Sequence, residues 1–191
     1  MAQAGRPLIS FDEYLFIESN SPIKHEYLDA VVWAMGGGTD QHAAVSASFI
    51  RLLGNQLIDK PCRVYTSDLR IRVKASGLAT YPDASVICDR VHFDAADPNR
   101  TTALNPRVLV EVTSPSTEKY DRAEKLDHYK RIASLKEVVI ASHRERLVEI
   151  WRKTGTRWVR HEYRDVALVA SIGCSLLLAD IYRDPFKGAG P

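Results

Sequence analysis

The chain has 191 residues, 45% of them apolar and 26% charged, which is the composition of one ordinary globular domain and excludes a disordered or fibrous chain. Its net charge of +2 neither supports nor excludes a nucleic-acid partner, because a local basic face can lie within a near-neutral total. No stretch approaches the roughly 18 apolar residues of a membrane span, so we expect no membrane partner. Three widely spaced cysteines without a CxxC pair indicate neither a disulfide framework nor a zinc site. We therefore expect a cytoplasmic protein.

The N-terminal part of the chain predicts a short helix followed by a β-hairpin. Ser10 and Glu13 have the spacing of a capping box, which marks the start of a helix. Residues 25–35 predict a β-hairpin that turns near Asp29 and Ala30.

A second helix follows a flexible joint of three glycines at residues 36–38. The joint lacks the spacing of a phosphate-binding loop. Apolar residues at helical spacing then predict a helix from Thr39 or Asp40 to about Ile58. His42 lies on the apolar face of this helix, so it is either at the edge of a site or a structural histidine with a satisfied partner.

Residues 63–73 predict a strand with alternating polar and apolar positions. Arg70 and Arg72 lie on one face of this strand and are able to contact a phosphate backbone. Alternating arginines on an edge strand also form solvated surfaces that discourage aggregation, and both interpretations remain open.

Two acidic residues occur in or beside apolar strands. Asp83 follows a proline just before an apolar run, and Glu111 lies within the run Val108–Val112. A buried carboxylate has to be paired, hydrogen-bonded or bound to a cation. On neighbouring strands, Asp83 and Glu111 would provide the oxygen ligands that Mg²⁺ prefers. Glu111 is otherwise a structural acid with a satisfied partner.

The segment after Glu111 predicts a capped helix that reaches about Ile132. Residues 114–117, Ser-Pro-Ser-Thr, break the strand and supply capping hydroxyls. Asp121 and Lys125 lie four residues apart on one helical face, so Lys125 is able to converge with Glu111 on one point. The alternative is an ordinary ion pair on a solvated helix.

The rest of the chain predicts further strands. Residues 137–142 form a buried strand, and the order of strand, helix and strand predicts a crossover with partly parallel pairing in a mixed sheet. Residues 147–152 and 157–163 predict a second hairpin in which Trp151 and Trp158 pack together. Residues 174–179 form a last apolar strand.

Several of these residues together resemble the signature of the Uma family of restriction endonucleases, a branch of the PD-(D/E)XK nuclease superfamily. The matching residues are Pro82-Asp83, Val110-Glu111-Val112 with residues 114–117, Asp121, Lys125 and Tyr129. The superfamily usually has a lysine two residues after the second acid, where this chain has Thr113. In the Uma family the lysine has moved to the following helix, which makes Lys125 the matching residue.

The resemblance implies an α/β fold with a restriction-endonuclease-like mixed sheet flanked by helices and additional hairpins, over one domain at 10–182 with tails at 1–9 and 183–191. It also implies an endonuclease that hydrolyses phosphodiester bonds of nucleic acid, most often DNA, with Mg²⁺ or Mn²⁺ as cofactor; a homodimer remains open. In this interpretation Asp83, Glu111 and the carbonyl of Val112 bind the metal. Lys125 acts on water or the transition state, and Lys125→Ala should abolish cleavage with the fold nearly intact. Residues with auxiliary roles would be Glu26, His42, Asp68 and Asp121.

Two alternatives remain open from the sequence. The first is a nuclease-fold module that binds nucleic acid or a protein without cleaving, which Thr113 at the usual lysine position favours. The second is a homo-oligomeric structural protein in which Glu111 meets a buried arginine and Lys125 lies far from Asp83.

Overall fold

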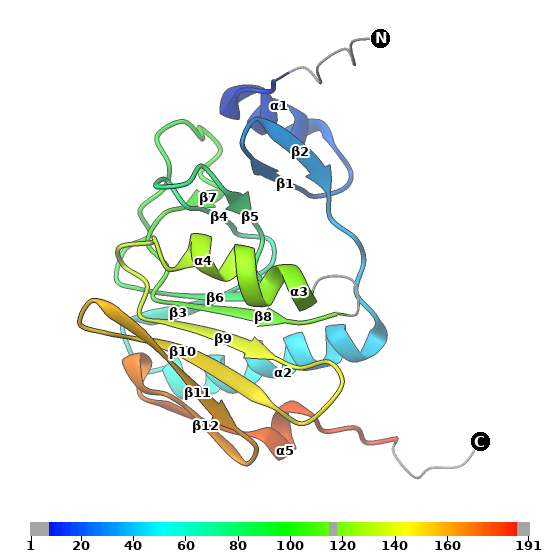
Figure 1. The fold of residues 1–191 in the computed structure, drawn as a ribbon, viewed down its shortest axis with the longest axis vertical. Helices are drawn as coiled ribbons and strands as arrows, with labels where there is room; N and C mark the ends of the chain where they lie inside the picture. The colour runs from blue at the N-terminus through cyan, green and yellow to red at the C-terminus, as the bar shows by residue number, and fades with distance from the viewer. Residues whose placement is uncertain (1–7, 115–117, 187–191) are drawn as a thin grey trace.

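The computed structural model describes residues 8–114 and 118–186, apart from the side chains of Lys119 and Asp121. Its centre is a mixed six-stranded sheet with the strand order β11-β10-β9-β8-β6-β3 (Figure 1). Within this sheet, as the structure describes it, β8 and β9 pair in parallel and the other neighbouring strands are antiparallel, as the sequence predicted for a crossover unit. The strands are β3 (Cys62–Thr66), β6 (Ala84–Cys88), β8 (Val108–Val112), β9 (Glu137–Ala141), β10 (Val148–Thr154) and β11 (Arg157–Tyr163).

Helices cover both faces of this sheet (Figure 1). Helix α2 (Asp40–Leu57) packs on one face and begins after the Thr39 cap, close to the predicted start. The crossover from β8 to β9 lies on the other face and consists of α3 (Glu118–Tyr120), the π-helical turn η1 (Asp121–Lys125) and α4 (Leu126–Tyr129). The predicted capping residues at 115–117 lie outside the described residues.

The alternation of side chains along β8 decides which way its acid points. Val108, Val110 and Val112 belong to the core under α2, whereas Leu109 packs with Leu126 and Tyr129 of α4. Successive side chains of a strand point to opposite faces of the sheet. Glu111 therefore faces the α3–α4 side, together with Leu109.

The N-terminal segment and the middle of the chain form a second sheet with the order β2-β1-β5-β4-β7. Helix α1 (Phe11–Asn20) begins with the predicted Ser10 and Glu13 capping box and packs on β1. The strands are β1 (His25–Leu28), β2 (Val31–Ala34), β4 (Arg70–Arg72), β5 (Ala79–Thr80) and β7 (Thr102–Ala103).

The C-terminal region adds a small two-stranded sheet and a short helix below α2 (Figure 1). Its elements are β12 (Val166–Val169), η2 (Ala170–Ile172), β13 (Cys174–Leu177) and α5 (Leu178–Ile181). In the part of the chain that the structure describes, no helix has the length and apolar character to cross a membrane.

The β1–β2 turn contains a backbone conformation that favours glycine. Asp29 and Ala30 both have positive φ, 50° and 63°, as a two-residue type I′ hairpin turn requires. Holding alanine in this left-handed region costs about 1–2 kcal/mol. We expect Ala30→Gly to stabilise the fold by about 1 kcal/mol. Glycine removes the strain, but it also raises the conformational entropy of the unfolded chain, which offsets part of this effect. Urea unfolding measures the change in the free energy of unfolding. The control is Ala34→Gly, at negative φ in the adjoining strand, which should destabilise the fold.

The expectation of an exposed basic face on residues 63–73 is wrong for Arg70 and Arg72. Strand β4 lies inside its sheet, between β5 and β7, and Arg70 is only 3% exposed. Its guanidinium donates to Asp97, Thr101, Thr102 and the Tyr81 hydroxyl. Arg72 donates to buried Asp94 at 2.8 Å and lies over the Phe11 ring. Both arginines therefore hold the loop at 92–102 onto the sheet.

The carboxylates of this loop predict a specific acid dependence of stability. Burial raises the pKa of Asp94, but the Ala96 N–H and the Arg72 guanidinium outweigh it and leave the pKa below its ordinary value. A carboxyl whose pKa is lower in the folded state stabilises the protein above its unfolded pKa, near 3.9, and this stability is lost as the pH falls through the folded pKa. We expect the melting temperature to fall in this acid range, and to fall less steeply in Asp94→Asn. Thermal melts at a series of pH values measure this dependence. An equal fall of the melting temperature with pH in both proteins would contradict the role of Asp94.

The structure also corrects the expectation about cysteines. Cys62 and Cys88 form a disulfide, because they lie opposite each other in the antiparallel register of β3 and β6. The two residues are 26 positions apart, so the sequence carries no local signal for the pairing. Cys174 is buried and free.

Candidate active site

Asp83 and Glu111 come together because β6 and β8 are neighbours. In the antiparallel register Ala84 pairs with Val110, so the next residues toward this end of the sheet are Asp83 and Glu111. The Oδ2 atom of Asp83 accepts a hydrogen bond of 2.7 Å from the Val112 backbone N–H. This bond fixes the first acid against the strand that carries the second.

Lys125 reaches the same point from the helical crossover. Its Nζ lies 3.0 Å from Glu111 Oε1 and 3.1 Å from Glu26 Oε1. All three residues are 5% exposed, so the lysine is a buried cation between two buried carboxylates. Lys125 is the last residue of η1, and π-helical turns are frequent at functional sites because they change the face that a helix presents.

Two hydroxyl groups complete the surroundings of these carboxylates. Tyr129 donates to Glu111 Oε1 at 2.5 Å, and Thr80 donates to Glu26 Oε1. Burial, and then the negative charge of Glu111, raise the pKa of Tyr129 well above its ordinary value, so its hydroxyl stays a hydrogen-bond donor. Thr80 was not predicted from the sequence, because it reaches the site through the pairing of β5 with β1.

His42 approaches Asp83 from the first turn of α2. Its Nε2 lies 3.3 Å from Asp83 Oδ2. The hydrogen bond to Asp83 raises the pKa of His42; partial burial opposes this effect, while the Asp83 charge and a hydrogen bond to the Val112 backbone add to it. The structure therefore places His42 at the edge of the site, one of the two positions that the sequence left open.

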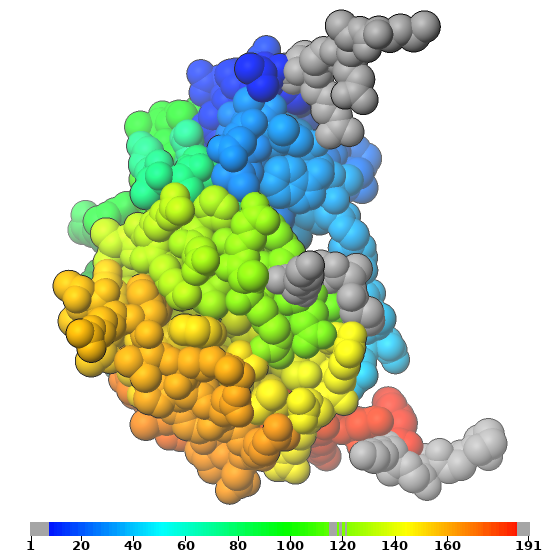
Figure 2. Space-filling view, in the orientation of Figure 1, coloured from blue at the N-terminus to red at the C-terminus, as the bar shows by residue number. Residues whose placement is uncertain are grey.

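A cleft of about 580 Å³ lies between the N-terminal hairpin and the crossover helix. Its lining includes Asp83, Glu111, Lys125, Glu26 and His42. Figure 2 shows the blue N-terminal segment directly against the green segment that includes α3 and α4. Besides the acids, Lys125 and His42, the lining includes Ile23, Lys24, Trp33, Ala34, Met35 and Gly36 to Gly38.

The structure does not place Asp68 or Asp121 among the residues that line the cleft. The side chain of Asp68 is 84% exposed and pairs with Lys24 at 2.6 Å, outside the residues that line the cleft. The side chain of Asp121 lies outside the described residues. The site therefore contains Asp83, Glu111, Lys125, Glu26 and His42.

The donor atoms fit a hard divalent cation. Asp83 and Glu111 both line the cleft, as does Val112, and Mg²⁺ is commonly held by one or two carboxylates together with water and substrate phosphate. Among residues 8–114 and 118–186, no group of three or more His, Cys, Asp or Glu side chains forms a metal cluster. These residues therefore do not form the closed set of His and Cys ligands of a structural zinc site.

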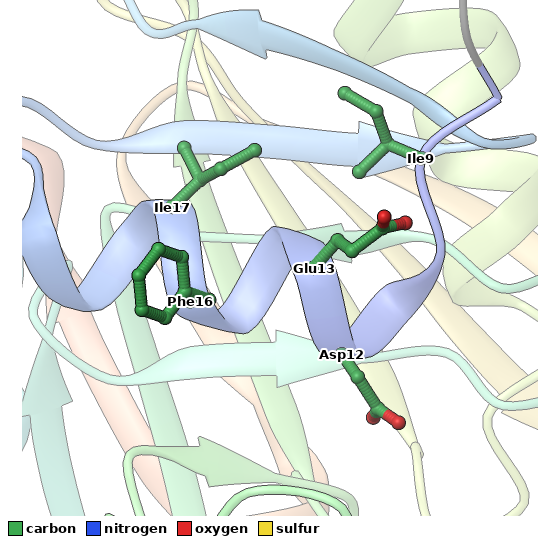
Figure 3. A pocket seen from close by; sticks show the side chains of 5 residues that line it. All are labelled: Ile9, Asp12, Glu13, Phe16 and Ile17. Carbon is green, nitrogen blue, oxygen red and sulfur yellow. The ribbon is translucent and has the colours of Figure 1, made fainter.

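A second hollow, of about 490 Å³, lies on the surface of α1 (Figure 3). It is lined by Ile9, Asp12, Glu13, Phe16 and Ile17. Glu13 is already committed to the capping box, where its carboxylate accepts from the Ser10 N–H at 2.7 Å. This hollow brings no group of catalytic side chains together.

Comparison with known proteins identifies similar sequences and a similar fold. The model of the Uma2 family, described as "Putative restriction endonuclease", matches residues 11–178. Two uncharacterized proteins of Synechocystis are related: slr1290 is 34% identical, with 93% of each chain covered, and sll1609 is 27% identical, with 85% of this chain and 91% of the relative covered.

A crystal structure of a "putative nuclease belonging to DUF820" from Anabaena variabilis superimposes with a TM-score of 0.74 at 16% identity. The alignment covers 91% of this chain and 97% of that one. The similarity confirms the predicted fold class, a mixed α/β sheet flanked by helices.

Proposed function

This chain belongs to the Uma2 family of restriction endonucleases, and on that premise we propose that it is a Mg²⁺-dependent endonuclease that hydrolyses phosphodiester bonds in DNA. The observation that carries the proposal is the convergence of Asp83, Glu111 and Lys125, from β6, β8 and the crossover helix, in one cleft. Carboxylates able to hold a metal ion, with a cation beside them, suit metal-assisted phosphodiester hydrolysis.

Each residue of the site has a role in this proposal. Asp83, Glu111 and the Val112 carbonyl would hold Mg²⁺, which lowers the pKa of bound water and offsets charge on the scissile phosphate. Lys125 orients the attacking water and stabilises negative charge that develops on the phosphate. Tyr129 holds Glu111 in position, and His42 does the same for Asp83, through the hydrogen bonds described above.

The distribution of charge supports a nucleic-acid substrate. Residues 122–164 contain 12 Lys and Arg but only 6 Asp and Glu, a net charge of +6 in a chain whose total is +2. The rest of the chain is therefore net acidic. A basic region beside the crossover helix favours a polyanion as partner.

Metal binding is testable apart from catalysis. Mg²⁺ is expected to raise the melting temperature of the wild type, because a ligand at about 100 times its Kd stabilises the folded state by about 2.7 kcal/mol. Asp83→Ala and Glu111→Ala should lose this shift, since each removes a ligand. Differential scanning fluorimetry measures the shift in melting temperature, first without Mg²⁺ and then as its concentration is raised in 10-fold steps. Asp12→Asn, an exposed acid on α1, is the matched control and should keep the shift; an equal shift in all four proteins would exclude the site.

A second candidate, a nuclease-fold module that binds without cleaving, is favoured by Thr113. This residue stands at the usual lysine position, is fully buried, and its Oγ1 is 2.9 Å from His143 Nδ1, so it takes no part in the cleft. Lys125 supplies the missing cation from the helix, which favours catalysis. Binding of DNA without cleavage under any Mg²⁺ or Mn²⁺ condition would favour the module instead.

A further inference from the structure

Trp33 lies beside the acid and lysine cluster because of the β1–β2 register. In this hairpin Glu26 and Trp33 are directly opposite each other. Residues opposite in an antiparallel pair share one face, with Cβ atoms about 4.5–5.5 Å apart. Since Glu26 contacts Lys125 at 3.1 Å, the indole of Trp33 lies next to the groups proposed to act on the phosphate.

The cleft around Trp33 has the chemistry of a base-binding wall. Trp33 is half-buried, with part of its ring packed against the core under α4 and part lining the cleft. Met35 and Ile23 extend the apolar surface. Beyond them a Cβ placed on Gly36 or Gly37 would have no atom within 4 Å, so the space next to this wall is open. Trp33, Met35 and Ile23 thus give the cleft an apolar surface beside the acids and the lysine, and this surface suits the flat face of a nucleobase.

We propose that Trp33 stacks on the base next to the scissile phosphate, and that the enzyme therefore acts on a strand whose base is unpaired. The proposal rests on the function proposed above. Aromatic side chains bind bases of single strands by stacking, without regard to sequence. In an intact duplex both faces of a base are covered by its neighbours, so stacking on Trp33 requires a single strand, a fork or a flipped nucleotide.

The burial of the site points in the same direction. Glu111, Glu26 and Lys125 are each 5% exposed, so a phosphate has to enter the cleft to meet them. A strand that leaves its partner is able to place one nucleotide inside, with the phosphate at the acids and the base on Trp33. The cleft of about 580 Å³ is in the size range of small-molecule sites and accommodates such a unit.

The first test compares substrates and tryptophan variants. Oligonucleotides of one sequence are supplied as single strand, fork and blunt duplex, with Mg²⁺, to the wild type, Trp33→Ala and Trp33→Phe. We expect the wild type to prefer the single strand and the fork. Stacking of one base contributes about 1–3 kcal/mol, so Trp33→Ala should raise KM for these substrates about 5- to 150-fold, while Trp33→Phe retains most of the affinity. Trp158→Ala, on β11 and outside the cleft lining, is the control and should leave KM unchanged.

The second test detects binding without cleavage. In the Asp83→Asn background, tryptophan fluorescence should be quenched by the single strand, and the quench should be absent when Trp33 is also replaced by Phe. An unchanged KM in Trp33→Ala, or a quench that persists without Trp33, would overturn the stacking proposal. In that case, cleavage by the wild type would still uphold the nuclease. A Trp33-dependent quench without cleavage by the wild type would uphold stacking and overturn the nuclease.

Discussion

Asp83→Asn is expected to reduce cleavage of DNA at least ~10³-fold, because a metal ion contributes several kcal/mol to stabilisation of the transition state and each ~1.4 kcal/mol is tenfold in rate. The substitution removes the charge but keeps an oxygen that is able to accept the Val112 N–H bond of 2.7 Å. The fold should therefore remain intact. Initial rates on a fluorescently labelled oligonucleotide, at saturating Mg²⁺ and matched salt, measure the loss.

Asp68→Asn provides the matched control for this variant. Asp68 is an acid of the same type, but its side chain is 84% exposed and pairs with Lys24. We expect the cleavage rate to change by less than about fivefold, since exposed ion pairs contribute about 0–1 kcal/mol. Cleavage by Asp83→Asn at the wild-type rate would remove the proposed metal site, whatever the result for Asp68.

The second large effect concerns stability. Lys125→Ala is expected to destabilise the fold by about 3–5 kcal/mol, because removing one partner of a buried ion pair leaves uncompensated charge. Here the lysine lies within 3.1 Å of both Glu26 and Glu111. These contacts replace the expectation from sequence, in which Lys125→Ala leaves the fold nearly intact, with a prediction of lower stability. Urea unfolding at neutral pH gives the free energy of unfolding for wild type and variant.

A double variant separates lost pairing from lost packing. Adding Glu26→Gln to Lys125→Ala removes one of the two uncompensated carboxylates, so part of the stability should return while cleavage stays absent. Lys130→Ala is the control on the same helix: its ammonium pairs with exposed Asp127 and lies 4.3 Å from the Trp151 ring, and its loss should cost no more than about 1 kcal/mol. A Lys125→Ala protein as stable as the wild type would show that the two carboxylates are not held as charged groups.

Much of the local structure was determined by the sequence itself. The capping box at Ser10 and Glu13, the turn at Asp29 and Ala30, and the start of α2 at Asp40 follow from short-range hydrogen bonding and backbone preference. The order of strand, helix and strand around β8 and β9 predicted parallel pairing, which the structure confirms. The acids inside apolar strands also marked the cleft, because a buried carboxylate always needs a partner.

What the sequence left undecided is which distant segments meet. Glu26 and Trp33 come from a hairpin that lies against the crossover helix, and Thr80 joins them through β5. Arg70 and Arg72 alternate like surface residues, yet the loop that supplies Asp94 and Asp97 covers them. Cys62 meets Cys88 only through the register of two strands.

The physical reason is the range of the interactions. Helix caps, turns and apolar periodicity depend on residues a few positions apart, so the sequence determines them alone. Strand order, register and the docking of the N-terminal hairpin depend on how whole faces pack, and a shift of one residue in register would turn Asp83 or Glu111 to the opposite face. Only the tertiary structure therefore decided that Lys125 lies between two carboxylates and that Trp33 lines the same cleft as Asp83 and Glu111.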